Sequence, residues 1–185
     1  IKSCAVADLV HAPAGLNDSR YQFTDLYNEG LSGILTEQAD GWFYKHNLGC
    51  GEFARAIPVV PKPSFTGLGS GLQFADLDAD GGKQLVSYQG VVPGFFELDD
   101  ENRWKRYTTF NNLPGINFKD ANTRMLDLDG DGKADVLITE ENVFVSYSSN
   151  GREGFVQGSR TNKPLNDEEG PSIVFADDTQ SIFLA

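Results

Sequence analysis

The fold expected for this chain is decided by one stretch, Asp127-Leu128-Asp129-Gly130-Asp131-Gly132-Lys133-Ala134-Asp135. Carboxylates stand at its first, third, fifth and ninth positions, and a glycine stands at its sixth. A tight loop with this spacing turns alternate side chains toward one point, and carboxylate and carbonyl oxygens are the ligands that Ca²⁺ prefers. Without a cation, carboxylates about 4 Å apart repel by roughly 1–4 kcal/mol per pair. The stretch therefore predicts a calcium site made by the side chains of Asp127, Asp129, Asp131 and Asp135 and the main-chain carbonyl of Lys133.

The residues around this loop indicate strands and not helices. An EF-hand opens with the same spacing, but it needs a bidentate Glu at position twelve, where this chain has Ile138. Residues 134–139 form an apolar, β-branched run, and residues 143–147 alternate like a second strand after a polar turn. We therefore expect the loop to connect β-strands.

A repeat runs through the chain in phase with this loop. An apolar-x-Asp-Leu motif recurs three times with its aspartates 51 residues apart, at Asp25, Asp76 and Asp127. An aromatic residue follows each aspartate by 28 positions, at Phe53, Trp104 and Phe155. Strand-like runs accompany the earlier copies at residues 33–36, 42–44, 84–88 and 95–98, with residues 47–51 expected as a loop.

Three or four short strands in each unit of about 50 residues predict an all-β protein made of β-propeller blades. The approximate repeats are 21–60, 72–112 and 123–160, and a further repeat starts at 173–185. A closed propeller typically has at least four blades, so we expect a partial propeller. The first residues, Ile1 to Cys4, show neither an initiator methionine nor a signal peptide, and we expect a piece of a longer polypeptide.

The two earlier loops keep the cation motif to different degrees. The second loop, residues 76–84, retains three carboxylates and has an amide at position nine, which predicts a weaker calcium site formed by Asp76, Asp78, Asp80, the carbonyl of Gly82 and Gln84. The first loop, residues 25–33, keeps only Asp25 and Glu29 at the usual positions. There we expect hydrogen bonds to replace a metal, with Tyr27 and Leu31 packed.

Composition excludes some classes of partner. The net charge of -12 and the pI near 4.4 argue against binding to a nucleic-acid backbone. No apolar run approaches the length of a membrane span. The two cysteines, Cys4 and Cys50, are too few for a disulfide framework and have no zinc-ligand spacing, so free thiols are favoured over a disulfide.

The second and third loops resemble the FG-GAP/VCBS calcium loops of integrin-type propellers. The wider text resembles, over essentially the whole chain, the propeller region of the SpvB-like B component of bacterial insecticidal toxin complexes (Tc toxins); it includes FTDLYNEGLSGILTEQADGWFYKHNLG, FADLDADGGKQLVSYQG, TRMLDLDGDGKADVLITEENVF and GPSIVFADDTQSIFLA. The resemblance implies a secreted virulence protein and a scaffold role. In that family the propeller belongs to a shell around a toxic C-terminal region, docks on the channel-forming A component and works with the C component.

Two other functions compete with this interpretation. In a carbohydrate-binding propeller lectin, the aromatic residues Trp42, Tyr44 and Trp104 would line sugar pockets. A core role is favoured for them, because Trp104 lies on the phase of the repeat. A hydrolase with structural calcium would need a catalytic residue outside the loops. The chain has only two histidines, His11 and His46, and residues 67–71 fit neither a nucleophile elbow nor a phosphate loop. We therefore expect a binding and structural module and not an enzyme.

Overall fold

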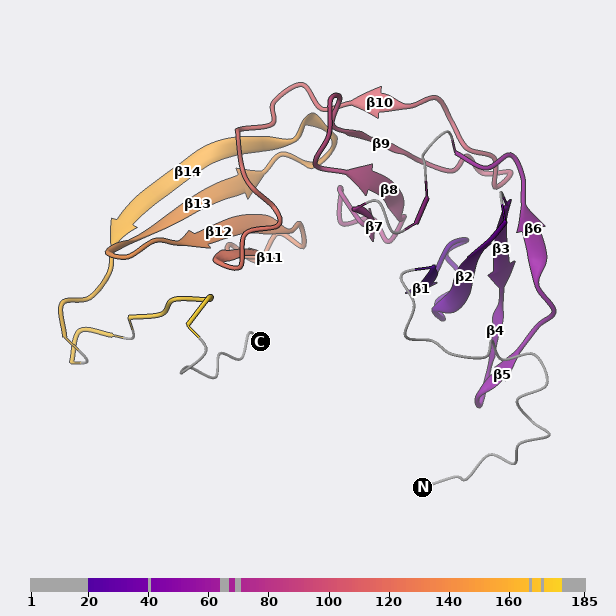
Figure 1. The fold of residues 1–185 in the computed structure, drawn as a ribbon, viewed down its shortest axis with the longest axis horizontal. Coiled ribbons are helices and arrows are strands. Elements are labelled where there is room, and N and C mark those ends of the chain that lie inside the picture. The colour runs from indigo at the N-terminus through magenta and orange to yellow at the C-terminus, as the bar shows by residue number, and fades with distance from the viewer. Residues whose placement is uncertain are drawn as a thin grey trace. The chain divides into compact units, whose positions relative to one another are not determined.

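The computed structural model describes residues 20–39, 41–63, 67–68, 71–166, 168–170 and 172–177. Within these ranges the chain forms β-strands and one 3-10 turn, η2 (Gly151–Glu153), and contains no α-helix, so the expected all-β class is confirmed (Figure 1). The strands are β1 (Tyr21–Thr24), β2 (Gly33–Gln38), β3 (Gly41–Lys45), β4 (Asn47–Gly49), β5 (Glu52–Phe53), β6 (Ile57–Val59), β7 (Leu72–Ala75), β8 (Gln84–Ser87), β9 (Gly94–Phe96), β10 (Thr108–Thr109), β11 (Thr123–Leu126), β12 (Asp135–Thr139), β13 (Val143–Ser149) and β14 (Phe155–Asn162). No helix in the described part of the chain is long and apolar enough to cross a bilayer.

The strands form three four-stranded sheets and one two-stranded sheet. Sheet 1 has the order β1-β2-β3-β6, sheet 2 has the order β10-β9-β8-β7, and sheet 3 has the order β11-β12-β13-β14. The pairings resolved between the strands are antiparallel, and strands adjacent in sequence lie beside one another in sheets 2 and 3. Such meanders need only short connections, which the turn-rich sequence supplies.

The three four-stranded sheets share one pairing register. In their first hairpins an offset of 51 residues relates the pairs Phe23↔Ile34, Phe74↔Leu85 and Met125↔Val136. The same offset relates the next pairs, Ile34↔Lys45, Leu85↔Phe96 and Val136↔Tyr147. A slip of one residue would move every side chain of a strand to the other face. Because the register is the same, residues 51 or 102 positions apart can be compared directly between sheets.

The two-stranded sheet was not expected from the sequence. Residues 47–51 were predicted to be a loop, but β4 and β5 pair there as an antiparallel hairpin with an irregular register between Asn47 and Gly49. The turn is made by Cys50 and Gly51, both with positive φ. The hairpin lies within the segment that connects β3 to β6 in sheet 1. The other predicted strand runs, at 33–36, 42–44, 84–88, 95–98, 134–139 and 143–147, all contain strands.

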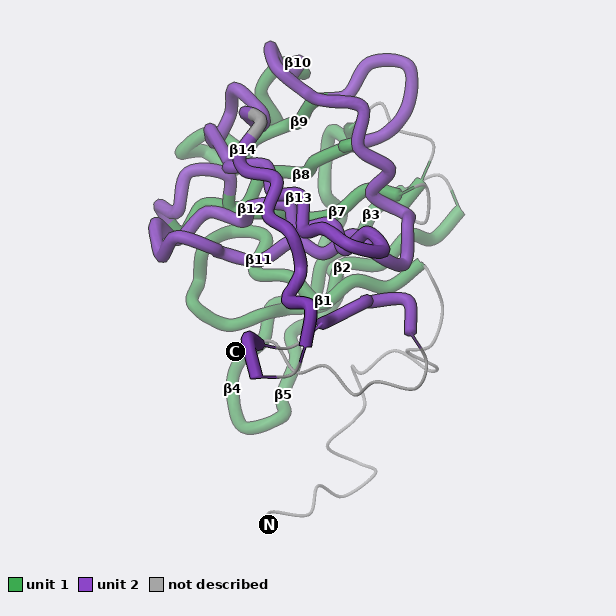
Figure 2. Tube along the Cα trace, turned by 90° about the vertical axis from the view of Figure 1, so that its left-hand side faces the viewer, with its two compact units in different colours: residues 1–76, 81–88, 94–108 green, residues 77–80, 89–93, 109–185 purple. Residues whose placement is uncertain are grey.

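The chain divides into two compact units (Figure 2). Unit 1 consists of Ile1–Asp76, Gly81–Tyr88 and Gly94–Thr108, and unit 2 consists of Leu77–Asp80, Gln89–Pro93 and Thr109–Ala185. Sheet 1 therefore lies in unit 1, and sheet 3 lies in unit 2.

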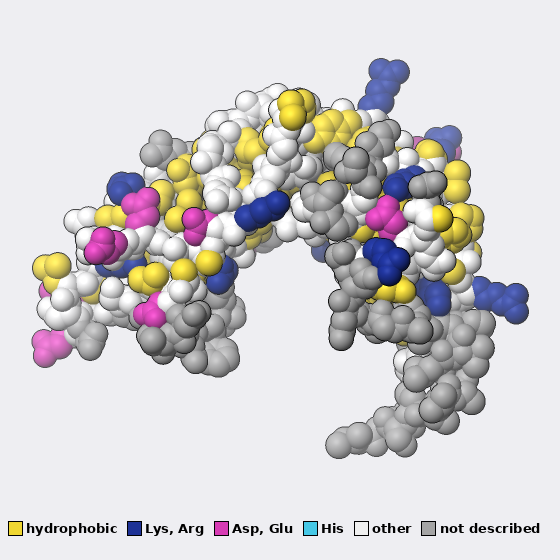
Figure 3. Space-filling view, in the orientation of Figure 1, with side chains coloured by type: hydrophobic (Ala, Val, Ile, Leu, Met, Phe, Trp, Pro, Cys, Tyr) yellow, Lys and Arg dark blue, Asp and Glu magenta, His cyan; other side chains and the backbone are white. Residues whose placement is uncertain are grey.

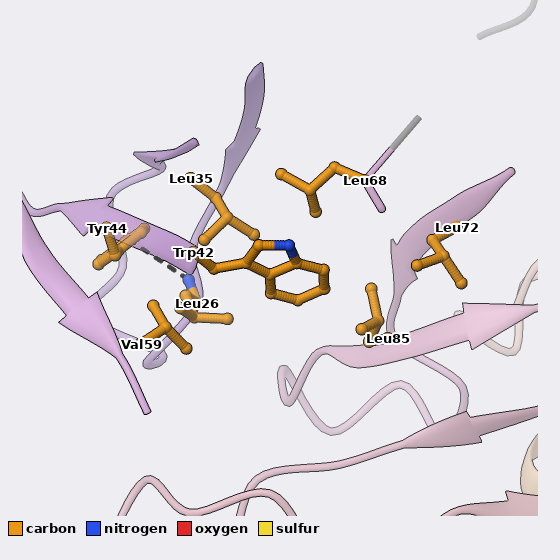
Figure 4. Close-up of a cluster of buried hydrophobic side chains, with 8 residues drawn as sticks. All are labelled: Leu26, Leu35, Trp42, Tyr44, Val59, Leu68, Leu72 and Leu85. Atoms are coloured by element: carbon orange, nitrogen blue, oxygen red, sulfur yellow. Dashed lines mark hydrogen bonds between the residues drawn. The ribbon is translucent and has the colours of Figure 1, made fainter. Parts of the chain in front are cut away.

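The largest buried hydrophobic cluster belongs to unit 1 (Figure 4). Sheet 1 and its first loop contribute Leu26, Leu35, Trp42, Tyr44 and Val59. The segment that leads into the next sheet contributes Leu68, and β7 and β8 contribute Leu72 and Leu85. Each of the eight side chains is at most 6% exposed. Burial of large aromatic and aliphatic side chains is the main source of stability in such a core.

Candidate metal centre

The three Asp-containing loops have the same backbone shape. Their fourth residues all have positive φ, at Asn28 (56°), Ala79 (58°) and Gly130 (83°). Their sixth residues are glycines with positive φ, at Gly30 (83°), Gly81 (90°) and Gly132 (85°). Glycine adopts this left-handed conformation without the steric cost that a Cβ imposes. The glycine at position six, predicted to matter in the third loop, is thus common to all three loops.

This shape aims one backbone amide at the first aspartate of each loop. The amide nitrogen of the sixth residue donates to the carboxylate at 2.7 Å for Gly30 and Asp25, 2.7 Å for Gly81 and Asp76, and 2.9 Å for Gly132 and Asp127. The repeated aspartate therefore closes its own loop as well as offering oxygen atoms.

The third loop brings three of the predicted ligands together. Carboxylate oxygens of Asp127, Asp129 and Asp135 all lie within 4.8 Å of one another. Two ligands on opposite sides of a calcium ion are separated by roughly 4.6–5.2 Å, because Ca–O distances are about 2.3–2.6 Å. The chemistry and spacing of these three groups therefore fit a hard divalent cation.

The carboxylate of Asp135 is held in place by burial and by two backbone amides. It is only 2% exposed. Its Oδ2 accepts from the amide of Leu128 at 3.0 Å, and its Oδ1 accepts from the amide of Ser149 at 2.7 Å. It is thus a structural anchor of the loop, whereas Asp127 and Asp129 are exposed at its surface.

Two further predicted ligands have other partners. The carboxylate of Asp131 pairs with the ammonium of Lys133, and this hydrogen bond lowers the pKa of Asp131 and raises the pKa of Lys133. Asp78 of the second loop pairs with Arg152, whose Nε lies 2.5 Å from Asp78 Oδ2. Gln84 is buried, and among the described residues no second group of three acidic ligands comes together.

The first loop uses hydrogen bonds, as expected. Asp25 accepts from the amides of Glu29 and Gly30 at 2.8 and 2.7 Å, and the Glu29 carboxylate contacts His46 Nδ1 at 2.7 Å. Tyr27 packs edge-on against Tyr44 with ring centroids 5.2 Å apart. The expectation that Leu31 packs is wrong, because that side chain is 47% exposed.

In the first copy, Tyr44 takes the place of the ninth loop residue. This role was not predicted from the sequence. Gly33 stands where the third loop has Asp135, and the hydroxyl of Tyr44 lies in the space that the missing side chain leaves. That hydroxyl accepts from the amide of Leu26 at 3.4 Å, as Asp135 does from the equivalent Leu128, and donates to the Thr24 carbonyl at 3.1 Å. A glycine at position nine with a tyrosine on the facing strand is the sequence signal for this exchange.

Of the aromatic residues considered for a sugar pocket, Trp42 and Tyr44 lie in the core and Trp104 packs against it. Trp42 is 1% exposed and Tyr44 is 0% exposed, so neither offers a ring face to a ligand. Trp104 is partly buried and packs edge-on against Phe96, with ring centroids 6.4 Å apart. For Trp104 the phase of the repeat favoured the core, and its ring is partly buried against the cluster.

Comparisons with known proteins add a structural likeness. No protein-family model matches the chain, and no curated protein matches it. A structure of the Tc holotoxin pore of Photorhabdus luminescens is similar at a TM-score of 0.65 with 26% identity, over 77% of this chain and 7% of that one. A lectin from Agrocybe aegerita that recognises non-reducing terminal N-acetylglucosamine is similar at a TM-score of 0.50 with 18% identity, over 77% of this chain and 37% of the lectin.

A third solved structure, a TcdB2–TccC3 complex without its hypervariable C-terminal region, gives a TM-score of 0.40 with 15% identity, over 86% of this chain and 13% of that one. The chain thus spans a small part of each toxin chain and about a third of the lectin. The likeness to the holotoxin pore shows that the chain has a fold of the kind found in a toxin-complex protein.

Proposed function

We propose that the chain is a calcium-stabilised segment of β-propeller blades from an SpvB-like B component of a toxin complex, where it acts as shell scaffold and docking surface. The observation that carries the proposal is the third loop, in which oxygens of Asp127, Asp129 and Asp135 meet within 4.8 Å between two strands of a four-stranded meander. The likeness to the Tc holotoxin pore supports the toxin-complex context.

In this proposal calcium acts as a structural ion. Asp127, Asp129 and Asp135 would hold it, and its charge would offset the mutual repulsion of carboxylates that the loop gathers. Asp131 and the carbonyl of Lys133 are the remaining ligands proposed, and the second loop is proposed as a weaker site. No catalytic step is assigned to the chain.

Thermal unfolding with calcium and with chelator tests the metal part of the proposal. An ion that binds only the folded state adds about 2.7 kcal/mol when its free concentration is a hundred times its Kd. We expect calcium to raise Tm, and Asp129→Ala to remove most of that rise while leaving Tm in chelator nearly unchanged. Asp135→Ala should lower Tm in both conditions, because it also removes the acceptor of two partly buried hydrogen bonds, from the amides of Leu128 and Ser149. Identical parent curves in calcium and chelator would overturn the site.

The toxin-complex part is tested separately. We expect the gene for this chain to lie beside reading frames for channel-forming A and cargo-bearing C components. The lectin alternative rests on the fold likeness to the Agrocybe aegerita protein, and it predicts reproducible, calcium-dependent binding on a glycan array. Such binding, from a gene with no toxin-component neighbours, would replace the scaffold proposal with the lectin.

A further inference from the structure

The second and third loops use the aspartate at position three in different ways. In the third loop, Asp129 belongs to the group of three carboxylates that meet within 4.8 Å. In the second loop the equivalent residue, Asp78, pairs with a guanidinium, and Arg152 Nε lies 2.5 Å from Asp78 Oδ2. Both partners belong to unit 2. A cation from the chain itself therefore lies at a position where the third loop offers its carboxylate to an ion.

The backbone that carries Arg152 is held by hydrogen bonds on its C-terminal side. Arg152 is the middle residue of η2. The amide of Asn112 donates to the Glu153 carbonyl at 2.9 Å, and the amide of Phe155 donates to the Asn112 carbonyl at 2.8 Å. A surface ion pair contributes little when two long side chains must be ordered to form it. Here the turn is already in place and the aspartate side chain is short, so most of the ordering falls on the arginine side chain.

The same turn touches the second loop directly. A Cβ on Gly151 would lie 2.7 Å from Asp78 Oδ1 and 3.1 Å from the Leu77 carbonyl oxygen, so a larger residue there would displace the Asp78 carboxylate. Gly151 is buried and has a φ of 59°. The side chains of Asp78 and Arg152 are 33% and 42% exposed. Their ion pair thus lies at a packed contact of η2 with the second loop.

A basic residue at this position is particular to the third copy of the repeat. The residues 51 and 102 positions before Arg152 are Glu101 and Cys50. The second loop also has the buried Gln84 at position nine, where the third loop has the buried Asp135. The affinity of an oxygen-ligand site for calcium depends on the number of charged ligands. Compared with the third loop, the second has one carboxylate exchanged for an amide and another neutralised by arginine.

We infer that Arg152 is the internal counter-ion of the second loop, which competes with calcium for the Asp78 carboxylate and so confines tight calcium binding to the third loop. Arginine stays protonated in proteins, so the competition does not depend on pH. A calcium ion that used Asp78 would have to displace Arg152 Nε from the carboxylate oxygen. The inference rests on the proposed function and deepens it, because it names the residue that sets the difference in calcium affinity between the two loops.

Calorimetric titration of the full chain with calcium tests the inference. Arg152→Gln removes the positive charge and keeps a polar side chain. We expect the parent to bind one equivalent tightly, and the variant to bind calcium at the second loop about tenfold or more tightly than the parent does, because a charged ligand becomes available there. Hydrogen exchange locates the gain, since calcium should slow amides 79–84 more in the variant than in the parent.

Two further variants separate this effect from a change in overall charge. Acidic and basic side chains are interspersed at the surface over β11–β14 (Figure 3). Arg160 of β14 pairs with Glu140 in unit 2, so Arg160→Gln removes the same charge but leaves the pair at Asp78 intact. Its calcium binding should equal that of the parent. Arg152→Lys keeps the charge beside Asp78 and should leave the second loop as weak a site as in the parent.

Thermal unfolding gives a second readout. In chelator, Arg152→Gln should lower Tm by more than Arg160→Gln does, because Asp78 loses this counter-ion beside the other carboxylates of its loop. Calcium should remove that difference, because the ion takes the place of the guanidinium. A variant that is equally destabilised or unfolded in calcium and in chelator would contradict the inference, since Arg152 would then have a structural role alone.

The outcomes distinguish the inference from the proposed function. Asp129→Ala disables the third loop, and in that background Arg152→Gln should still gain calcium binding at the second loop. A parent that binds no calcium, together with a double variant that binds one equivalent, would overturn the third-loop site and leave the inference standing. A parent that binds tightly, and whose titration Arg152→Gln does not change, would overturn the inference alone. An equal gain in Arg160→Gln or Arg152→Lys would also overturn it, because the charge beside Asp78 would then not be the cause.

Discussion

At the scale of single residues, one carboxylate serves two different purposes along the repeat. Asp25 and Asp127 each close a loop by accepting backbone amides, but only Asp127 has two other carboxylates within 4.8 Å. Around Asp25 the remaining acid, Glu29, is engaged by His46. The difference between a hydrogen-bonded loop and a candidate metal loop therefore lies in the neighbours of the repeated aspartate.

Asp25→Ala is expected to destabilise the chain by the same amount with and without calcium. The variant removes the acceptor of two amide hydrogen bonds, at 2.8 and 2.7 Å, which are worth about 1–2 kcal/mol together. Isothermal calorimetry should give the parent's calcium stoichiometry. A lost binding equivalent would place a calcium site in the first loop.

Glu37 predicts a stability that depends on pH. Burial raises the pKa of Glu37, but the hydrogen bonds from Lys62, Leu68 and Trp42 outweigh it, so the pKa lies below its ordinary value. A group with a lowered pKa in the folded state stabilises it above the unfolded pKa of about 4.3, and this contribution disappears as the pH falls through the folded pKa.

Glu37→Gln should therefore lower Tm at pH 7, by the equivalent of about 1–2 kcal/mol. The difference between variant and parent should shrink as the pH falls below about 4.3. Glu52→Gln, at an exposed position on β5, is the control and should track the parent at every pH. A difference that stays constant down to pH 3 would contradict the assigned role of the charge.

At the scale of elements, two loop glycines share a backbone conformation but differ in their surroundings. Gly30 and Gly132 have nearly the same φ, 83° and 85°, but a Cβ on Gly30 would meet nothing within 4 Å, whereas a Cβ on Gly132 would lie 2.8 Å from the Cβ of Ala79. The first position tests the cost of the left-handed backbone alone. The second adds a steric clash to it.

Gly30→Ala should cost about 1 kcal/mol from the backbone conformation, and Gly132→Ala should cost clearly more. Urea unfolding measured in chelator compares the two without a contribution from metal. Equal decreases in the free energy of unfolding would show that Ala79 moves aside. The contact between Gly132 and Ala79 would then not contribute to stability.

Much of each element could be predicted from local pattern, and the errors have physical causes. A continuous β-branched run located β12, and an alternating run located β13. The β4–β5 hairpin was missed, since it depends on positive φ at Cys50, which few non-glycine residues adopt. In the candidate site, the spacing identified Asp127, Asp129 and Asp135. It could not show that Lys133 and Arg152 would pair with neighbouring aspartates, because those contacts depend on the rotamers of long side chains.

At the scale of the whole molecule, the three carboxylates that meet in the third loop, those of Asp127, Asp129 and Asp135, belong to unit 2, and this predicts where calcium acts. Hydrogen exchange in calcium, compared with chelator, should slow at the third loop and at the ends of β11 and β12. The first loop and β1–β3 in unit 1 should exchange unchanged, and amides 79–84 report whether the second loop binds as well. Equal protection of both units would mean that calcium acts by general stabilisation and not at the proposed loop.

Identical registers in three sheets create a hazard during folding, because a strand from one sheet has the right spacing to pair with the wrong partner, a common failure of repeated architectures. The residues at position nine of the loops counter it. A Cβ on Gly33 would lie 2.4 Å from the Tyr44 hydroxyl, so a side chain at this position, such as Gln84 of β8 or Asp135 of β12, would clash with Tyr44 if its strand paired with β1 in place of β2. The difference between the ninth loop residues therefore disfavours pairing of β1 with a strand of another sheet. A polypeptide with three identical copies would lose this protection against strand exchange.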